Sequence, residues 1–367
     1  MIRAARRLFP SGAIALYTGR MFLWRSLAVL AALVLVLQTL DVLGESGQIL
    51  AQPGNGDAQV WHYVSLRLPQ IIARFMPFAV LLGTLITFAT LNQNSEVIAM
   101  KASGASARQI LAPLIMVSIV IAGLSFVFND RIVARATATL SAWQAAEYGP
   151  IPVDRGVASN VWVRDGDDLI RAATAQGSGP AARLTDVSVY DRVGGRLTAI
   201  VEAAEARPGE GGWVMPNATR FDVESGVRTN VPRFVMGRGV TPDQFTLAEV
   251  RADEHSFGSL YSAIGELRAA GRPTRALEAG LWHKLSGPMS VILMPLLAAV
   301  AAFGLARSGR LFLRAVIGMA LGFTYFVADN FALAMGNLGA YPPFLAAWAP
   351  FLLFLLIGEA VLIRSEE

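Results

Sequence analysis

A mixed polar and apolar stretch, SEVIAMKASGAS, occupies residues 95–106 between two long apolar segments. As a helix of about residues 93–109, it would place apolar side chains, a lysine and a glycine on one face at three- and four-residue steps. A serine suited to cap the helix and an acidic residue in the first turn would begin it. The residues that would contact a partner there are Ser95, Glu96, Val97, Met100, Lys101 and Gly104.

Two roles fit this segment. It could lie flat on a membrane surface, or it could insert into a groove on a separate motor protein and receive force from it. The chain has no phosphate-binding Gly-Lys-Ser/Thr loop of its own, because neither of its two lysines, Lys101 and Lys284, follows a glycine. A motor that acts on this segment would therefore belong to another chain.

Ionisable residues also lie inside or beside the apolar segments, where an unpaired charge is costly. Asp41 follows the first apolar run, Asp329 lies in the fifth and Glu359 in the sixth. We expect Asp41 and Glu359 to reach interfacial water, whereas Asp329 fits a functional and a structural role equally well. Four arginines gather near one end of the second and third segments, and they either are solvated or bind a phosphorylated lipid: Arg67, Arg74, Arg131 and Arg135.

The residue types in the chain and their spacing argue against a catalytic function. The three histidines, His62, His255 and His283, are far apart in sequence, and neither His-x-x-Glu-His nor Gly-x-Ser-x-Gly occurs. The chain has no cysteine, which excludes disulfides, thiol catalysis and zinc–thiolate sites. We therefore expect a protein that is not an enzyme and that holds no cofactor or metal.

The composition is that of a membrane protein. Of all residues 54% are hydrophobic and 16% are charged, whereas a soluble chain carries about 25% charged residues. The net charge of +4 is small for 367 residues, which argues against binding to nucleic acid.

Six segments are long enough to cross a bilayer, which takes roughly 20 apolar residues. Basic residues at the amino terminus, in residues 101–108 and in residues 307–314 place both termini in the cytoplasm. The basic start continues to Arg25 and no small-x-small site follows, so we expect a retained span rather than a cleaved signal. The predicted spans are residues 21–43, 68–91, 110–129, 284–305, 311–335 and 344–363.

The region between the third and fourth spans has a different pattern of apolar and polar residues. Alternating apolar and polar residues with Asp-Gly and Gly-Gly turns predict an antiparallel sandwich or curled sheet outside the cytoplasm. Leu260, Ile264 and Leu267 then recur at helical spacing and predict a helical stalk. The expected division is three spans with the cytoplasmic helix (1–133), a β domain (134–255), a helical linker (256–280) and three further spans (281–367).

The whole chain resembles the LptF/LptG family of lipopolysaccharide export permeases. The most specific segment is SEVIAMKASGAS, and LWHKLSGPMSVILMPLLA, RSGR, Asp329 and YPPFLAAWAPFLLF follow in the family's order. LDVLGESGQ and PPFLAAWAP are more similar to the LptG branch. The resemblance implies a helical membrane protein with six spans (3+3) and an inserted, β-jellyroll-like periplasmic domain.

The resemblance also implies partners and a mechanism. LptF and LptG would pair in the bacterial inner membrane above two copies of the ATPase LptB, and lipopolysaccharide would pass from their cavity to LptC. Glu96 would pair with a basic residue of the ATPase, while Val97, Met100 and Gly104 would pack into its groove. The family's lateral gates involve the first and fifth spans, which here contain Gln38, Asp41, Gly318 and Gly322.

One departure from the family concerns the phosphates of the lipid. Some relatives carry lysines near the outer end of the first span, where this chain has Gln38, Gly44 and Glu45. The four arginines named above are then the candidate phosphate ligands. Within the β domain, positions such as Trp162 and Val189 are predicted to face inward, toward the lipid.

Two other function classes remain as alternatives. A scaffold that relays ATPase action to a periplasmic partner without transport would also carry a coupling helix, but it commonly has four spans. An ion-coupled transporter would show inverted repeats and paired carboxylates deep in several spans. Neither feature is evident in this sequence.

Overall fold

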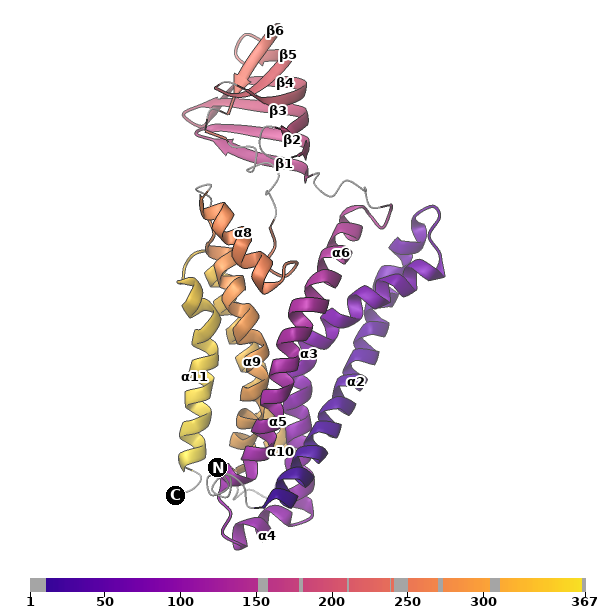
Figure 1. Ribbon diagram of the computed structural model, residues 1–367, viewed down its shortest axis with the longest axis vertical. Coiled ribbons are helices and arrows are strands. Elements are labelled where there is room, and N and C mark those ends of the chain that lie inside the picture. The colour runs from indigo at the N-terminus through magenta and orange to yellow at the C-terminus, as the bar shows by residue number, and fades with distance from the viewer. Residues whose placement is uncertain are drawn as a thin grey trace. The chain divides into compact units, whose positions relative to one another are not determined.

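The computed structural model describes residues 11–150, 158–177, 181–209, 211–237, 239–240, 250–269, 273–303 and 311–364 (Figure 1). The chain forms two compact units. The helical unit consists of Met1–Ile151, Arg251–Ile264 and Thr274–Glu367, and the β unit consists of Pro152–Val250 and Gly265–Pro273. Arg307 and Arg310, which supported the predicted topology, lie outside the described residues.

Six helices among the described residues are long and apolar enough to span a membrane. The predicted number of spans is therefore confirmed, and the helices extend beyond the apolar runs. They are α2 (Gly12–Ala51), α3 (Asp57–Gln93), α5 (Ala107–Phe128) with its continuations η1 (Asn129–Val133) and α6 (Ala134–Ala145), α9 (Arg275–Phe303), α10 (Leu311–Asn337) and α11 (Pro343–Arg364).

The third spanning helix is longer than predicted. Residues Ala134–Ala145 were expected to begin the β domain, but they continue α5 through the π-helical turn η1. Their sequence, ARATATLSAWQA, contains neither glycine nor proline, so nothing in it ends a helix. The burial of Leu140 and Trp143 anchors this extension on the helical unit.

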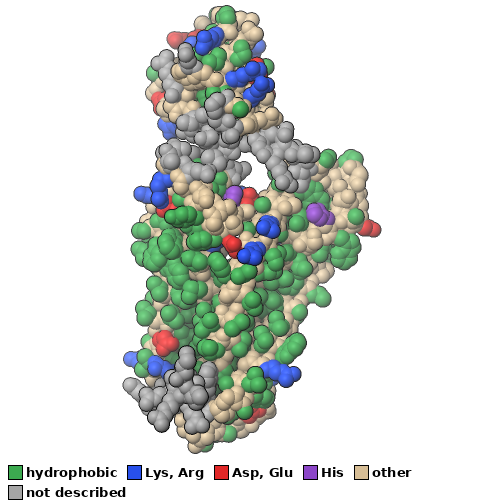
Figure 2. All heavy atoms as spheres, in the orientation of Figure 1, with side chains coloured by type: hydrophobic (Ala, Val, Ile, Leu, Met, Phe, Trp, Pro, Cys, Tyr) green, Lys and Arg blue, Asp and Glu red, His purple; other side chains and the backbone are tan. Residues whose placement is uncertain are grey.

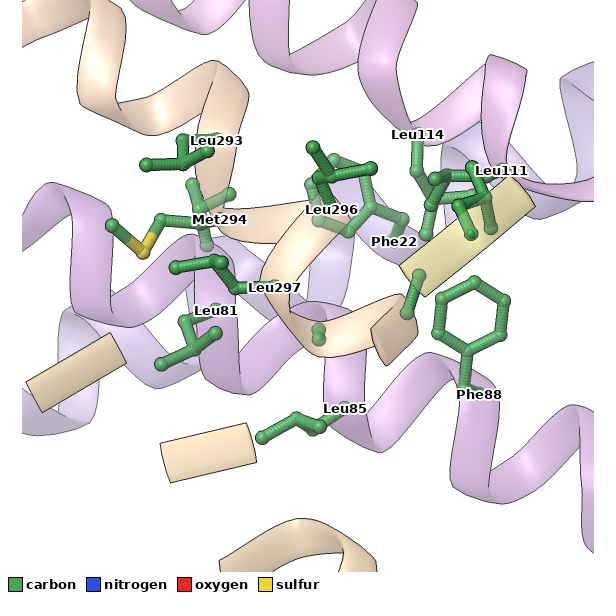
Figure 3. Close-up of a cluster of buried hydrophobic side chains, with 14 of the residues drawn as sticks. Phe22, Leu81, Leu85, Phe88, Leu111, Leu114, Leu293, Met294, Leu296 and Leu297 are labelled. Carbon is green, nitrogen blue, oxygen red and sulfur yellow. The ribbon is translucent and has the colours of Figure 1, made fainter. Parts of the chain in front are cut away.

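One apolar cluster holds the spanning helices together. Ten of its side chains come from α2, α3, α5 and α9 and interdigitate in Figure 3: Phe22, Leu81, Leu85, Phe88, Leu111, Leu114, Leu293, Met294, Leu296 and Leu297. Small residues permit close helix approach beside it, since a Cβ at Gly83 would overlap Ser26 and one at Gly358 would overlap Leu296. Hydrophobic side chains also cover the middle of the outer surface in Figure 2, as expected for contact with lipid.

A short helix, α4 (Glu96–Ala102), connects α3 to α5. In Figure 1 it lies at the same end of the helical unit as the first turn of α2 and the last turn of α11. We call this end the α4 end. Helix α8 (Phe257–Ala269) precedes α9, and Leu260, Ile264 and Leu267 are buried along it.

The β unit is one antiparallel sheet whose strands lie in sequence order. Glycines with positive φ occupy its tight turns, as at Gly194 and Gly195 between the third and fourth strands. A jellyroll would bring strands distant in sequence together, and the described strands do not. The strands are β1 (Ala158–Asp165), β2 (Asp168–Gln176), β3 (Arg183–Val193), β4 (Arg196–Gly209), β5 (Gly212–Asp222) and β6 (Arg228–Met236).

The two faces of this sheet differ. Val161, Ala172, Val189 and Val201 belong to a buried apolar cluster on one face, whereas Trp162 is 51% exposed. Successive side chains on a strand point to opposite faces, so Trp162 cannot share the inner face with its neighbour Val161. The prediction that both Trp162 and Val189 face inward is therefore wrong for Trp162.

Candidate functional site

The segment between α3 and α5 is broken rather than one continuous helix. Helix α4 spans only seven residues, Glu96–Ala102, instead of the predicted 93–109. Gly104, at φ +88°, takes a left-handed conformation that ends the helix. Ser106 then caps α5: its Oγ accepts from the backbone N of Gln109 at 3.2 Å, and the Gln109 side chain accepts from the backbone N of Ser106 at 3.1 Å.

The start of α4 also differs from the prediction. Ser95 is in the left-handed region at φ 59°, and its side chain accepts no capping hydrogen bond from α4. The Glu96 carboxylate is held from two sides, because Tyr17 Oη donates to its Oε1 at 3.3 Å and Asn94 Nδ2 donates to the same oxygen at 3.2 Å. The hydrogen bond from Tyr17 thereby connects Glu96, at the start of α4, to the first turns of α2.

The apolar residues of α4 divide into two sets. Val97 and Met100 are only 5% and 8% exposed, and they pack into the core of the spanning helices. They therefore cannot fill a groove on a partner in this conformation, which corrects the role that the resemblance implied for them. Ile98 is 66% exposed. We define the α4 surface as the side chains of α4 that are not buried in the core: Glu96, Ile98, Ala99, Lys101 and Ala102.

At the opposite end of the unit, Asp41 and Arg67 form an ion pair between α2 and α3. Arg67 Nη2 lies 3.0 Å from Asp41 Oδ1, and Arg67 Nε lies 3.1 Å from Oδ2. Tyr63 Oη donates to Oδ2 at 2.6 Å, and Arg67 also donates to Gln70 at 2.8 Å. Asp41 is thus paired while its side chain stays 21% exposed, and the guanidinium group of Arg67 already has protein partners.

A second polar contact joins the end of α2 to the residues after α6. Tyr148 Oη donates to Glu45 Oε2 at 2.7 Å, and burial raises the pKa of Tyr148, so the phenol remains a neutral donor. Asn55 Nδ2 donates to the carbonyls of Ile49 and Tyr148 at 2.9 Å each. A cavity of about 540 Å³ adjoins these groups.

Arg131 and Arg135 lie one turn apart on η1 and α6, both exposed, with no ion pair among the described residues. Asp130 beside them accepts a hydrogen bond from the backbone N of Phe257 at 2.5 Å, which fixes the start of α8. The two arginines line a cavity of about 590 Å³ together with Asp130, Ala134, Glu254, His255, Ser256 and Ser259. Two adjacent guanidinium groups can bind phosphate oxygens in a bidentate manner.

Between α9 and α10 lies a buried polar seam. His283 Nε2 lies 3.0 Å from Asp329 Oδ2, and Asp329 is only 9% exposed. The other carboxylate oxygen, Oδ1, and the hydroxyl of Tyr325 are buried and have no hydrogen-bond partner within the described part of the chain. The sequence noted His283 only as an isolated histidine, and its separation of 46 residues from Asp329 hid the pair.

The proposed gate residues do not meet at one point within the chain. Gln38 is 9% exposed, and neither polar atom of its amide has a partner. Gly318 and Gly322 are buried on α10, where a Cβ at Gly322 would overlap Leu81 of α3. Helix α10 packs on α3, α9 and α11, whereas α2 packs on α3 and α5. Across the described residues, no group of three histidine, cysteine or acidic side chains is arranged to hold a metal ion.

Comparisons with known proteins agree with this architecture. The family described as "Lipopolysaccharide export system permease LptF/LptG" matches residues 16–364. The chain is 25% identical to lipopolysaccharide export system permease protein LptG of Escherichia coli K12, over 97% of this chain and 99% of that protein. It is also 25% identical to LptG of Haemophilus influenzae, over 93% and 97% of the two chains. The chain therefore belongs to the LptF/LptG family of lipopolysaccharide export permeases.

Proposed function

We propose that this chain, a permease subunit of lipopolysaccharide export and a multi-pass inner-membrane protein, is driven by a separate ATPase that docks on the α4 surface. The α4 end would then face the cytoplasm together with both termini, and the β unit would face the periplasm. The observation that carries the proposal is the division of α4, in which Ile98 is exposed while Val97 and Met100 are buried in the core.

This division suits a force-transmitting contact. A partner that closes on Ile98 and Glu96 gains apolar contact and a charged anchor, which are the elements of helix-in-groove recognition. Because Val97 and Met100 pack in the same cluster as side chains of α3, α5 and α9, a displacement of α4 moves that cluster directly. Closely packed interiors transmit displacement instead of absorbing it.

The partners are proposed from the membership of the LptF/LptG family. The similar proteins are permease proteins named LptG, and we propose LptF as the heterodimer partner, LptB as the ATPase dimer and LptC as the periplasmic acceptor. Helices α2 and α10 expose apolar side chains that a second permease subunit and lipid would cover. These include Leu35, Leu40, Leu43, Met319, Phe323 and Phe331.

The substrate itself would be held by charge and by shielding. Each methylene of an acyl chain that is exposed to water costs about 0.8 kcal/mol, so the chains need a continuous apolar path. Arg131 and Arg135 are the described arginines best placed for the phosphates, because they are adjacent, exposed and unpaired at a cavity. Arg67 is less suited, since Asp41 and Gln70 occupy its guanidinium group.

The docking proposal is tested by Glu96→Lys. We expect this variant to lose co-purification with the ATPase and to lose export, while the membrane unit stays folded. Glu359→Lys is the matched control, because Glu359 is a half-exposed acid of the last spanning helix that forms a 3.5 Å ion pair with Arg108. Unchanged ATPase association in Glu96→Lys, or equal loss in both variants, would show that the α4 surface is not the docking site.

The phosphate proposal has a separate test. The double variant Arg131→Gln and Arg135→Gln should retain less lipopolysaccharide on purification, and a lipid without phosphates should bind both forms equally. Arg164→Gln in the β unit is the control, since Arg164 is exposed and its contacts with Asp167 and the Gly166 carbonyl are local. A double variant that retains the phosphorylated lipid as well as the unchanged chain does would contradict the assignment.

A further inference from the structure

Arg74 is one of the arginines of the spanning helices whose side chain pairs with no group among the described residues. Arg74 lies inside α3, is exposed, and makes no ion pair or hydrogen bond among the described residues. Arginine in a membrane-spanning segment is costly unless it pairs with another group or faces a water-filled cavity. Asp41, an acid on the neighbouring helix α2, is unavailable, because Arg67 and Tyr63 already occupy both of its oxygens.

The packing of α3 against α10 points to another acid. Leu81 of α3 fills the space beside Gly322 of α10, and the rings of Phe78 and Phe326 lie 5.1 Å apart. Residue numbers fall along α3 as they rise along α10, so the two helices run antiparallel at this contact. Because each step is three or four residues on one helical face, the next pair in the series is Arg74 and Asp329.

Asp329 has capacity for this partner. Its Oδ2 is 3.0 Å from His283 Nε2, while its Oδ1 is buried and unpartnered. A buried carboxylate oxygen without a donor is an energetic cost that a guanidinium group would remove. One carboxylate can therefore join three helices, with His283 from α9 on one oxygen and Arg74 from α3 on the other.

We propose that Arg74 and Asp329 form an ion pair in a second state of the transport cycle, in which α3 and α10 come together at this level. His283 keeps Asp329 in place in the present state, and the Arg74 side chain is exposed. Arg74 thus acts as a positioning residue between two helices rather than as a ligand of the lipid phosphates. The export assay below rests on the proposed function, whereas the cross-linking assay does not.

A double-mutant cycle of export tests the pair. Arg74→Gln and Asp329→Asn should each lower the export rate about fivefold or more, the lower limit of typical coupling between two sites. The combined variant should be no slower than the slower single variant, and Arg74→Lys should retain part of the rate. Single variants without effect overturn the proposal, and so do two losses that multiply, because a phosphate-binding Arg74 would act independently of Asp329.

Cysteine cross-linking tests the geometry directly, because the chain contains no native cysteine. Arg74→Cys with Asp329→Cys should form a disulfide under oxidant in membranes of cells that hold the complete export system, read as linked peptides by mass spectrometry. A disulfide needs Cα atoms within about 7 Å, so it reports a real approach. Leu81→Cys with Gly322→Cys is the positive control, since a Cβ at Gly322 would lie 3.4 Å from Leu81 Cγ.

The negative control pairs Arg74→Cys with Val327→Cys, since Val327 is exposed and lies two residues from Asp329 on another side of α10. A 74–329 disulfide above this background supports the pair. Linkage of the 81–322 control alone overturns it. A 74–329 disulfide, together with an unchanged chain that neither retains nor exports lipopolysaccharide, would leave the ion pair standing and refute the proposed function instead.

Discussion

Ile98 is exposed on α4 while its neighbour Val97 is buried, and this difference leads to a quantitative prediction for Ile98→Ala. Ile98 is 66% exposed, so docking of a partner can bury about two thirds of its side chain. Loss of three methyl or methylene groups at about 0.8 kcal/mol each, scaled by that fraction, removes about 1–2 kcal/mol of binding free energy. The affinity for the ATPase should therefore fall roughly 5- to 30-fold.

The stability of the membrane unit should not change in this variant, because the deleted groups are already exposed. Val97→Ala is the matched control on the adjacent position. Val97 is 5% exposed and belongs to the core cluster, so its truncation should lower the free energy of unfolding by about 1–3 kcal/mol. Val97→Ala should lower the affinity for the ATPase less than Ile98→Ala does.

Both quantities can be measured on the purified full chain. Titration of labelled permease with ATPase gives the dissociation constant, and thermal unfolding in detergent gives the stability. The reasoning fails if Ile98→Ala binds the ATPase as tightly as the unchanged chain does. It also fails if Val97→Ala abolishes binding at unchanged melting temperature, because Val97 would then be part of the docking face.

Three further predictions concern other parts of the molecule. Asp41→Asn leaves Arg67 without its charged partner and should cost about 1–3 kcal/mol of stability; an unchanged melting temperature would contradict the pairing. Gly322→Leu should cost about 1–3 kcal/mol by overpacking, whereas Gly44→Ala, with nothing within 4 Å, should be neutral; equal effects would refute the close contact. A photo-cross-linker at Val189 should capture lipopolysaccharide only with ATP, and capture without ATP would argue against driven loading of the inner face.

The succession of spanning helices along the chain was predictable, because each span is visible in the local composition. An apolar run of about 20 residues identifies a span wherever it folds. The extension of the third span was missed because ARATATLSAWQA has few strongly apolar residues, although nothing in it ends a helix. Gly104 was assigned to the face of the short helix, while its positive φ instead ends that helix.

The pairing of the ionisable residues was not predictable from the sequence. Asp41 and Arg67 are 26 residues apart, and His283 and Asp329 are 46 apart. Such pairs depend on which helices become neighbours and at which height, and hydropathy gives neither. The sequence therefore selected Asp41, Arg67 and Asp329 as unusual positions without their partners. The same applies to Tyr17, whose contact with Glu96 spans 79 residues.

The distribution of apolar and polar contacts bears on where the helices can move. Near α4, side chains of α2, α3, α4, α5 and α9 share one apolar cluster, and separating them would open cavities at substantial cost. Farther from α4, polar groups also join the helices: Asp41 of α2 contacts Arg67 and Tyr63 of α3, and His283 of α9 contacts Asp329 of α10. Exchanging one hydrogen-bonded partner for another costs less than separating packed apolar side chains. A displacement of α4 should therefore move the apolar cluster near α4 as one unit. The spacing of the helices should then change at the opposite end, at the level of Arg74 and Asp329.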